Sequence, residues 1–418
     1  MKTLIQHTLT LGTLLVAAMG CGSGETLSDA GKLASGNDAL CHLSKSGKLR
    51  CWGYSPEYNT TGGVPHREDF VARHGEEGAY SIPYEVFPEW RFLDVAMAER
   101  STCAIRDDGM LFCWGDQAWG QKGGLAADGT REGLVQVGND TDWRSVAGDA
   151  DIDGATYCAI KTSGQLWCWG SNRWDQLGQG EDFVPPNDRS PIQVGTDTDW
   201  ATVELSLGGA CALKENGTLW CWGDTMGAFA RYDESGSYPT MEYKEPTQPK
   251  PDMTFIDIHL KFGSCVVSSD HEVYCWGPNN YGSLAGLPPK GGVNPMWKLE
   301  PAGKPVKVAS SSGTNCVLTQ AGEIECNGYG TRLGRGELDA SYTLYTDRQN
   351  PFLGSYEFGP ILKPGPFVDI WAGGTSICAA HQDGTIWCWG DTYMDMAPLM
   401  MEDQGYAWAP ARLQIPQD

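Results

Sequence analysis

The chain has 418 residues, a length that suits either two or three average domains or one repeat array. Its 54 Gly, 24 Pro and 17 Trp, with only 20% charged residues, are typical of short strands joined by many turns and exclude a largely helical protein. The net charge of −23 would repel a phosphate backbone, so we expect no nucleic-acid partner.

The N-terminus has the form of an export signal. An apolar run over residues 9–19 follows a positive start and is too short to span a bilayer. The run ends in AMGC, which resembles the lipobox of bacterial lipoproteins, although Ala18 stands where Leu is usual. We predict a signal peptide at residues 1–20, a lipid anchor at Cys21 within a flexible tether over residues 21–30, and a location in the cell envelope, at an outer membrane or cell surface.

Fourteen of the fifteen cysteines form pairs that repeat along the chain. The two members of each pair are ten residues apart, and successive pairs begin 51 to 62 residues apart, so seven similar units cover residues 31–418. Cys21 is left over, which favours the anchor over the alternative that it is a structural thiol after ordinary signal cleavage. The pairs are Cys41 with Cys51, Cys103 with Cys113, Cys158 with Cys168, Cys211 with Cys221, Cys265 with Cys275, Cys316 with Cys326 and Cys378 with Cys388.

Each pair flanks a predicted β-hairpin. Six units have a Gly six residues after the first Cys, at the last position of a three-residue turn that needs a positive φ, and the fifth unit has His271 there. This register puts the two cysteines opposite each other with Cα atoms about 4.5–5.5 Å apart, so we predict seven disulfides. Metal ligation is the competing use, but it favours spacings of two to four residues and clustered His. The glycines are Gly47, Gly109, Gly164, Gly217, Gly322 and Gly384.

A Trp-Gly dipeptide follows the second Cys in six units, and Asn327 replaces the Trp in the sixth unit. Because side chains alternate along a strand, Trp and Cys face opposite sides of the sheet. We therefore predict that the sheets are packed on both faces and that these tryptophans are core residues: Trp52, Trp114, Trp169, Trp222, Trp276 and Trp389.

Two more strands are predicted upstream of each hairpin. One often starts with an aromatic residue, and the other is clearest in the similar segments 135–143 and 192–200. Their short connectors predict that the two are hairpin neighbours within one blade. Four antiparallel strands repeated seven times predict an all-β, seven-bladed β-propeller of four-stranded blades.

Ring closure needs one more element. The first unit begins near Lys32 without its fourth strand, and residues 411–415 at the other end of the chain have the pattern of a strand. We predict that this C-terminal strand completes the first blade and closes the ring.

The segment WGSNRWDQLGQG at residues 169–180 resembles the repeat of the regulator-of-chromosome-condensation family, whose signature is a Gly, Asn, Gly-Gln-Leu-Gly-x-Gly stretch. Segments 114–123, 276–284 and 331–336 match it in part. The resemblance covers residues 31–418 and implies a seven-bladed propeller that binds proteins. Family members include exchange factors for a small GTPase and a secreted β-lactamase inhibitor, but neither activity carries over residue by residue.

Three long insertions, at residues 54–89, 224–254 and 336–366, are rich in Tyr, Pro, Asp and Glu. Tyrosines in loops are typical anchors of protein interfaces, and the alternative is that these loops pack on their own blades. The candidate binding residues are Tyr80, Tyr84, Tyr232, Tyr238, Tyr243, Tyr342, Tyr345 and Tyr356.

One acidic motif resembles half of a calcium loop. Asp149, Asp151 and Asp153, followed by Gly154, give alternate carboxylates and a glycine turn, but Ile160 stands where the loop's bidentate Glu is expected. The candidates are a Ca²⁺ ion and a plain solvated turn, and we expect no other cofactor.

The sequence carries no HExxH, GxSxG, P-loop or dinucleotide motif. We predict a non-enzymatic monomer that touches the membrane through its anchor only and binds a protein or a cell-envelope component through its blade loops. The alternatives are an enzyme inhibitor similar to the β-lactamase-inhibiting propeller, and an enzyme such as a glycan lyase with a site assembled across blades.

Overall fold

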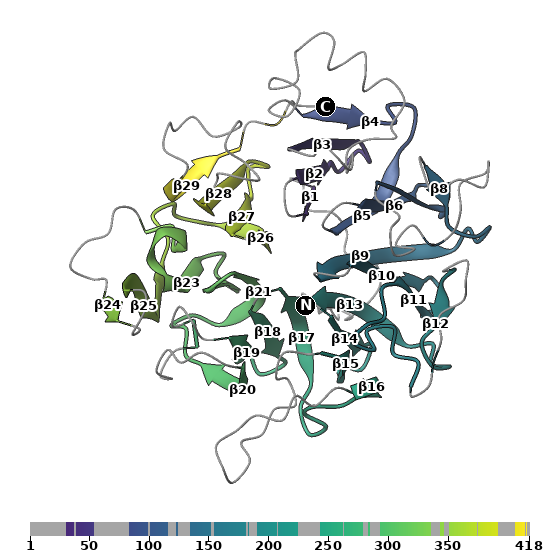
Figure 1. The fold of residues 1–418 in the computed structure, drawn as a ribbon. Coiled ribbons are helices and arrows are strands. Elements are labelled where there is room, and N and C mark those ends of the chain that lie inside the picture. Colours follow the sequence, from purple (N-terminus) through teal and green to yellow (C-terminus); the bar gives the residue numbers. More distant parts are fainter. Residues whose placement is uncertain are drawn as a thin grey trace, which may run out of the picture.

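Seven antiparallel sheets stand as blades around a central axis in the computed structural model (Figure 1). The seven-bladed β-propeller predicted from the repeats is therefore confirmed. The residues that the structure describes are 31–36, 39–53, 83–98, 101–115, 123, 134–151, 154–180, 183, 190–206, 208–224, 243–261, 263–278, 283–284, 293–335, 343–346, 351–373, 375–391, 406–413 and 415.

Each blade is built from strands that are consecutive in the chain, ordered from the axis to the rim. Blade 1 contains β1 (Lys32–Ser35), β2 (Ala39–Leu43), β3 (Leu49–Gly53) and β4 (Tyr84–Val86). Blade 2 contains β5 (Phe92–Ala98), β6 (Ser101–Arg106), β7 (Leu111–Gly115) and β8 (Val135–Gln136). Blade 3 contains β9 (Trp143–Asp151), β10 (Gly154–Lys161), β11 (Leu166–Gly170) and β12 (Ile192–Gln193). Blades 4 and 5 contain β13 (Trp200–Ser206), β14 (Gly209–Lys214), β15 (Leu219–Gly223) and β16 (Tyr243–Thr247); and β17 (Phe255–Leu260), β18 (Ser264–Ser268), β19 (Val273–Pro278) and β20 (Val293–Leu299).

Blade 6 differs from the expected four strands because it has five. A further strand pairs outside its fourth strand, and a single 3₁₀ turn, η1 (Gly330–Arg332), follows its third. Its strands are β21 (Pro305–Ser311), β22 (Thr314–Thr319), β23 (Ile324–Tyr329), β25 (Pro351–Pro360) and, outermost, β24 (Thr343–Thr346); blade 7 contains β26 (Phe367–Ala372), β27 (Ser376–His381), β28 (Ile386–Asp391) and β29 (Tyr406–Arg412).

The cysteine register is as predicted in all seven blades. The paired cysteines lie directly opposite each other on the second and third strands, as Cys41 and Cys51 do on β2 and β3. The turn glycines have φ between 78° and 83°, and His271 has φ 63°. All seven predicted disulfides form: Cys41 with Cys51, Cys103 with Cys113, Cys158 with Cys168, Cys211 with Cys221, Cys265 with Cys275, Cys316 with Cys326 and Cys378 with Cys388.

One detail of the cysteine geometry differs from the expectation. The Cα atoms of each pair are 4.0 to 4.1 Å apart, closer than the 4.5–5.5 Å of an ordinary opposed pair, in Cys103 with Cys113 and Cys316 with Cys326 as in the other five. The covalent bond draws the two strands together at this position. Each disulfide closes a loop of about ten residues and is worth about 2–3 kcal/mol in the chain-entropy model.

The short strands β8 and β12 correct one prediction. β8 pairs with β7 at the rim of blade 2, and β12 pairs with β11 at the rim of blade 3. Neither strand forms a hairpin with the strand that follows it in the chain. Residues 137–142 then connect the rim of blade 2 to the axis of blade 3. Six extended residues reach up to about 20 Å, so a short connector does not by itself indicate a hairpin.

The predicted closure of the ring is wrong for the same reason. The fourth strand of blade 1 is β4, where Tyr84 pairs opposite Cys51. The C-terminal strand β29 belongs to blade 7, where Ala411 pairs opposite Cys388. In every blade the outer strand comes after the hairpin in the sequence. The last blade therefore uses the C-terminal segment as its outer strand, and the first blade does not.

Blades 7 and 1 meet through side chains. Leu413, which follows β29, is buried with Cys388 of blade 7 and with Leu33, Leu40 and Trp52 of blade 1. Apolar packing at this seam closes the ring, with no strand shared between the two blades among the strands described.

One rule describes the packing between neighbouring blades. The disulfide of one blade faces the Trp-Gly tryptophan of the next, as Cys158 and Cys168 of blade 3 face Trp222 of blade 4. The six tryptophans are at most 1% exposed, which confirms their predicted place in the core. Between blades 5 and 6, Asn327 stands in place of the tryptophan.

Candidate functional site

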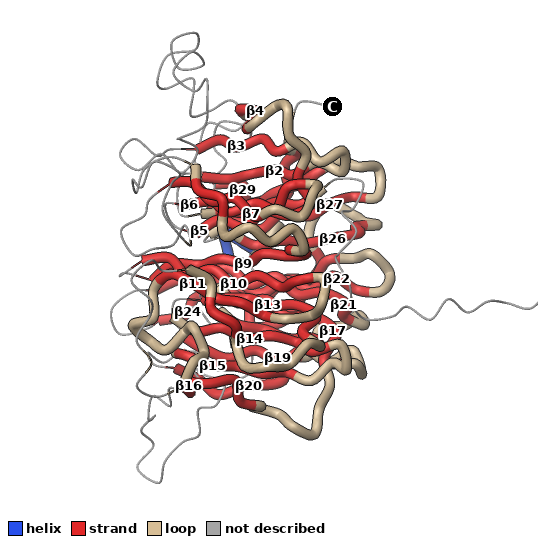
Figure 2. The backbone as a smooth tube through the Cα atoms, turned by 90° about the vertical axis from the view of Figure 1, so that its right-hand side faces the viewer, coloured by secondary structure: helices blue, strands red, loops and turns tan. Residues whose placement is uncertain are grey.

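The two faces of the ring differ in their connections. At the hairpin face lie the glycine turns between the second and third strands and the short connectors from one blade to the next, such as residues 44–48 and 87–91. At the opposite face, which we call the loop face, each third strand ends and each fourth strand begins. Figure 2 shows several of the hairpin-face turns, drawn in tan, on one side of the molecule. The short turns between first and second strands, such as residues 312–313, lie at the loop face.

The hairpin face is fastened by its own side chains. The Lys161 ammonium lies 5.0 and 5.1 Å from the ring centres of Trp143 and Trp167, and it forms ion pairs with Asp140 and Asp142 of the connector from blade 2. A cation between two indoles, closed by two carboxylates, ties the connector to the turn. In blade 3 the charged groups of this turn and connector therefore pair with one another.

Blade 4 repeats this arrangement. Lys214 lies 5.0 Å from the rings of both Trp200 and Trp220 and contacts Asp197 and Asp199 at 2.6 and 3.0 Å. Partial burial opposes the charged ammonium, but the hydrogen bonds to the two carboxylates outweigh burial and raise the pKa of Lys214. The near-identical connectors of these two units are thus explained by one structural role.

The loop face carries an ion pair between blades that are not neighbours. Asp149, near the end of β9, accepts a hydrogen bond from the Lys261 ammonium at 2.9 Å. Lys261 directly follows β17 of blade 5, so the pair passes over the inner end of blade 4, where Ser206 donates to the Lys261 carbonyl at 2.6 Å. A small hollow between blades 3 and 4 lies beside it, lined by Asp149, Thr156, Gln176 and Ser206 among others.

The charge state of Lys261 fits a clamp. Burial favours the neutral amine, but the attraction and hydrogen bond of Asp149, with Glu204 nearby, outweigh burial and raise the pKa of Lys261. The ammonium stays protonated and paired, so it holds the β9–β10 hairpin in place and does not act as a general base.

The calcium motif is described only in part. Asp149 faces the Lys261 ammonium. Asp153 lies outside the described residues, as does the side chain of Asp151, and no group of three His, Cys, Asp or Glu side chains that could hold a metal occurs among the residues described. Calcium binding stays a prediction that the structure does not test.

The tyrosine predictions have mixed outcomes. Tyr84 is not an exposed anchor: it is 9% exposed in β4 and packs in the cluster between blades 1 and 2. Tyr243 is half-buried in β16. The remaining candidates, or their side chains, lie outside the described residues: Tyr80, Tyr232, Tyr238, Tyr342, Tyr345 and Tyr356.

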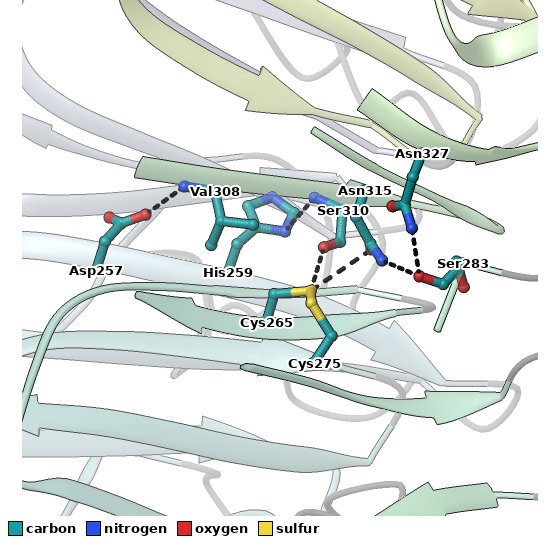
Figure 3. The surroundings of a disulfide bond; sticks show 9 residues. All are labelled: Asp257, His259, Cys265, Cys275, Ser283, Val308, Ser310, Asn315 and Asn327. Carbon is teal, nitrogen blue, oxygen red and sulfur yellow. Dashed lines mark hydrogen bonds between the residues drawn. A yellow bond between two sulfur atoms is a disulfide. The ribbon is translucent and has the colours of Figure 1, made fainter. Parts of the chain in front are cut away.

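A polar cluster that sequence reasoning missed lies between blades 5 and 6 (Figure 3). Ser310 donates its hydroxyl to Cys265 Sγ at 3.1 Å, and its backbone N–H donates to His259 Nδ1 at 3.2 Å. The side-chain amides of Asn315 and Asn327 both donate to the carbonyl of Ser283, at 2.9 and 3.0 Å. Asn327 was the available signal, since it is the one departure from the Trp-Gly pattern.

His259 is neutral within this cluster. Burial, with the Lys261 ammonium nearby, lowers the pKa of His259 from 6.5 to about 3. The neutral ring can accept the Ser310 N–H, as the geometry requires.

This pKa makes stability depend on pH. Below pH 6.5 the unfolded chain takes up a proton on His259 that the folded chain refuses until pH 3, so stability is lost as the pH falls through this window. His259→Gln keeps an acceptor and removes the titration. We expect the wild type to lose about 3 kcal/mol more than the variant between pH 7 and pH 4. Urea unfolding at both pH values measures this, and equal losses would contradict the assignment.

No family model matches the chain. It is 26% identical over 223 residues to the E3 ubiquitin-protein ligase HERC2 of Homo sapiens, covering 51% of this chain and 4% of that protein. It is also 26% identical over 264 residues to the mitochondrial RCC1 domain-containing protein RUG3 of Arabidopsis thaliana, covering 60% of this chain and 57% of that one. The yeast RCC1 protein Prp20, in its structure bound to Kap60, matches 98% of this chain with a TM-score of 0.69 and 14% identity.

The chain is thus similar in sequence to the RCC1 domain-containing protein RUG3 and in fold to the RCC1 protein Prp20, in agreement with the resemblance of its repeats. In that structure Prp20 is bound to another protein, Kap60. The chain spans a small part of the human ligase and just over half of the plant protein. The activities of those proteins are therefore not assigned to this chain. Each of its own blades carries one disulfide.

Proposed function

We propose that the protein is an exported, lipid-anchored module that binds another protein or a cell-envelope component through its loop face. The observation that carries the proposal is the asymmetry of the two faces: connections long enough to carry binding residues join the third and fourth strands of every blade. At the hairpin face the turns are short, and in blades 3 and 4 they are tied to the connectors from the preceding blades. The connections are residues 54–83, 116–134, 171–191, 224–242, 279–292, 330–350 and 392–405.

The start of the first blade supports the orientation of such a module. Lys32 at the start of β1 pairs opposite Leu43, the residue before the hairpin turn of blade 1, so the chain enters the fold at the hairpin face. A tether over residues 21–30 reaches about 35 Å when extended. A lipid on Cys21 would then hold the hairpin face toward the membrane and leave the loop face outward. Among the described residues, no helix is long and apolar enough to cross a membrane.

Changing Cys21 to Ser tests the anchor. We expect the variant to move from the detergent phase to the aqueous phase on phase separation, because the acyl chains supply the membrane affinity. Its melting temperature should equal that of the wild type, since Cys21 lies before the first described residue of the propeller. A wild-type N-terminus without lipid mass would contradict the anchor and leave the binding proposal standing.

A photo-crosslinking pair tests the binding face. Arg173 is exposed at the loop face and Asp142 lies at the hairpin face with its side chain 42% exposed, so each position can carry a photoreactive amino acid. In intact cells we expect crosslinked adducts from position 173 and none above background from position 142. Adducts from position 142 alone would mean that the ligand binds at the hairpin face, which would contradict the proposal.

A further inference from the structure

Most of the exposed large apolar side chains among the described residues lie on one face. They are four in number: Leu93, Trp297, Leu362 and Val368. Leu93 and Val368 are the second residues of the inner strands β5 and β26, at the end of each strand that meets the hairpin face, and Leu362 lies in the connector that enters blade 7. Three of the four therefore lie on the hairpin face, while Trp297 lies on the rim strand β20.

A recurrent β-bulge explains the exposure of Leu93 and Val368. In blades 2 to 7 the pairing of the first and second strands shifts at the same place and leaves one extra residue on the first strand. A bulge redirects the side chain of the extra residue, and in blades 2 and 7 that residue is 49% and 46% exposed. These two blades stand on either side of blade 1 around the axis (Figure 1), where the chain enters the fold.

The connector into blade 7 extends this apolar surface. Every second residue from 362 to 368 is exposed and apolar. The equivalent connectors, residues 137–142 and 194–199, expose glycine, asparagine, threonine and aspartate instead, so the fold of a connector does not require apolar residues here. We call the five apolar residues on the two sides of blade 1 the seam patch: Leu93, Leu362, Pro364, Pro366 and Val368.

Lysines lie between the two sides of the seam patch. The hairpin turn of blade 1 carries Lys45 and Lys48. The turns on either side, in blades 2 and 7, carry Asp108 and Asp383, whose carboxylates are bonded within their own turns. In a chain of net charge −23, ammonium groups beside exposed apolar side chains indicate a surface for phospholipid, where basic groups meet phosphate headgroups and apolar groups meet the acyl chains.

We propose that the seam patch docks on the lipid bilayer that holds the acyl anchor, with its apolar side chains at the boundary of headgroups and acyl chains. This inference rests on the proposed anchor at Cys21 and adds a second contact, which fixes one orientation of the ring. A tether over residues 21–30 keeps the patch within about 35 Å of the bilayer. The local concentration of lipid is therefore high, so a weak contact is enough to hold the docked orientation.

Quenching by nitroxide-labelled lipid tests the docking. A fluorescent amino acid replaces Gln382, which is exposed in the blade 7 turn and whose N–H donates to the Pro366 carbonyl, or Arg173 at the loop face. The full lipidated protein is bound to vesicles of phosphatidylcholine and phosphatidylglycerol that carry a nitroxide on part of their headgroups. We expect strong quenching at position 382 and none above background at position 173.

Leu93→Ser combined with Val368→Ser removes the two bulge contacts. Both side chains are about half exposed, so the double variant should keep the melting temperature of the wild type. It should shift the equilibrium between docked and undocked protein about tenfold toward the undocked state, seen as weaker quenching at position 382. Trp297→Ser is the matched control, because it removes a larger exposed side chain from the rim and should leave the quenching unchanged.

Lys45→Glu combined with Lys48→Glu tests the headgroup contact without altering an apolar residue. We expect this variant to reduce quenching at position 382 on vesicles that contain phosphatidylglycerol, and to reduce it less on phosphatidylcholine alone. The variant also serves where replacement of Leu93 and Val368 lowers the melting temperature. Quenching that both double variants leave unchanged would overturn the docking.

The outcomes separate this inference from the anchor on which it rests. Equal quenching at positions 382 and 173, on vesicles that carry the protein, would overturn the docking and leave the anchor standing. Lipidated protein that does not bind vesicles would overturn both. In intact cells a photoreactive residue at position 93 should crosslink to lipid, and adducts with a protein in place of lipid would assign the seam patch to a protein partner and overturn the inference.

Discussion

Replacing Trp222 by alanine is expected to lower the free energy of unfolding by about 3–5 kcal/mol. The indole is fully buried against the Cys158–Cys168 disulfide of the preceding blade, and its N–H donates to the Gln176 carbonyl at 2.8 Å. The variant leaves a cavity and a carbonyl without its donor. Urea unfolding with the disulfides intact measures the loss.

Trp297→Ala is the control for this prediction. Trp297 is 42% exposed on β20, the outer strand of blade 5, so its replacement should cost less than about 1 kcal/mol. Similar losses in the two variants would mean that the Trp-Gly tryptophans do not hold the blades together.

Deleting residues 406–418 is expected to make the protein aggregate or melt at a markedly lower temperature. The deletion removes β29 and with it Leu413, so β28 gains an unpaired edge and the seam loses an apolar contact. Deleting residues 416–418, which removes no described residue, should cost little.

Hydrogen exchange distinguishes this arrangement from closure through the first blade. In the truncated protein, amide protection should fall in β28 (Ile386–Asp391) and persist in β3 (Leu49–Gly53), because β3 keeps its partner β4. The reverse pattern would restore closure through the first blade.

Features with a local signal could be predicted from the sequence. The cysteine spacing and the turn glycine determine the hairpin register without reference to the rest of the chain, which is why every disulfide was predicted. Alternation along a strand likewise assigned the tryptophans to the core.

The errors arose where one strand has two candidate partners. β8 lies in the sequence between the hairpin of blade 2 and the first strand of blade 3, and its apolar pattern suits pairing with either. Assigning such strands to the following blade also led to the wrong assignment of β29 to blade 1. The ion pair of Asp149 with Lys261 joins residues 112 positions apart and has no local signature. Beyond the family signature near their starts, the loop-face connections carry no repeat signal, so the sequence pattern does not indicate a ligand.

The contiguous blades have a consequence for the order of the chain. No described strand is shared between the first and last blades, so each blade corresponds to one uninterrupted stretch of sequence. A circularly permuted chain that begins at Trp143, with residue 415 joined to residue 31 by a linker, would keep every strand pairing of the ring. For the same reason, a gene segment encoding one blade can be duplicated or exchanged without cutting a described sheet, and none of the strands described acts as a latch that fixes where the chain must start.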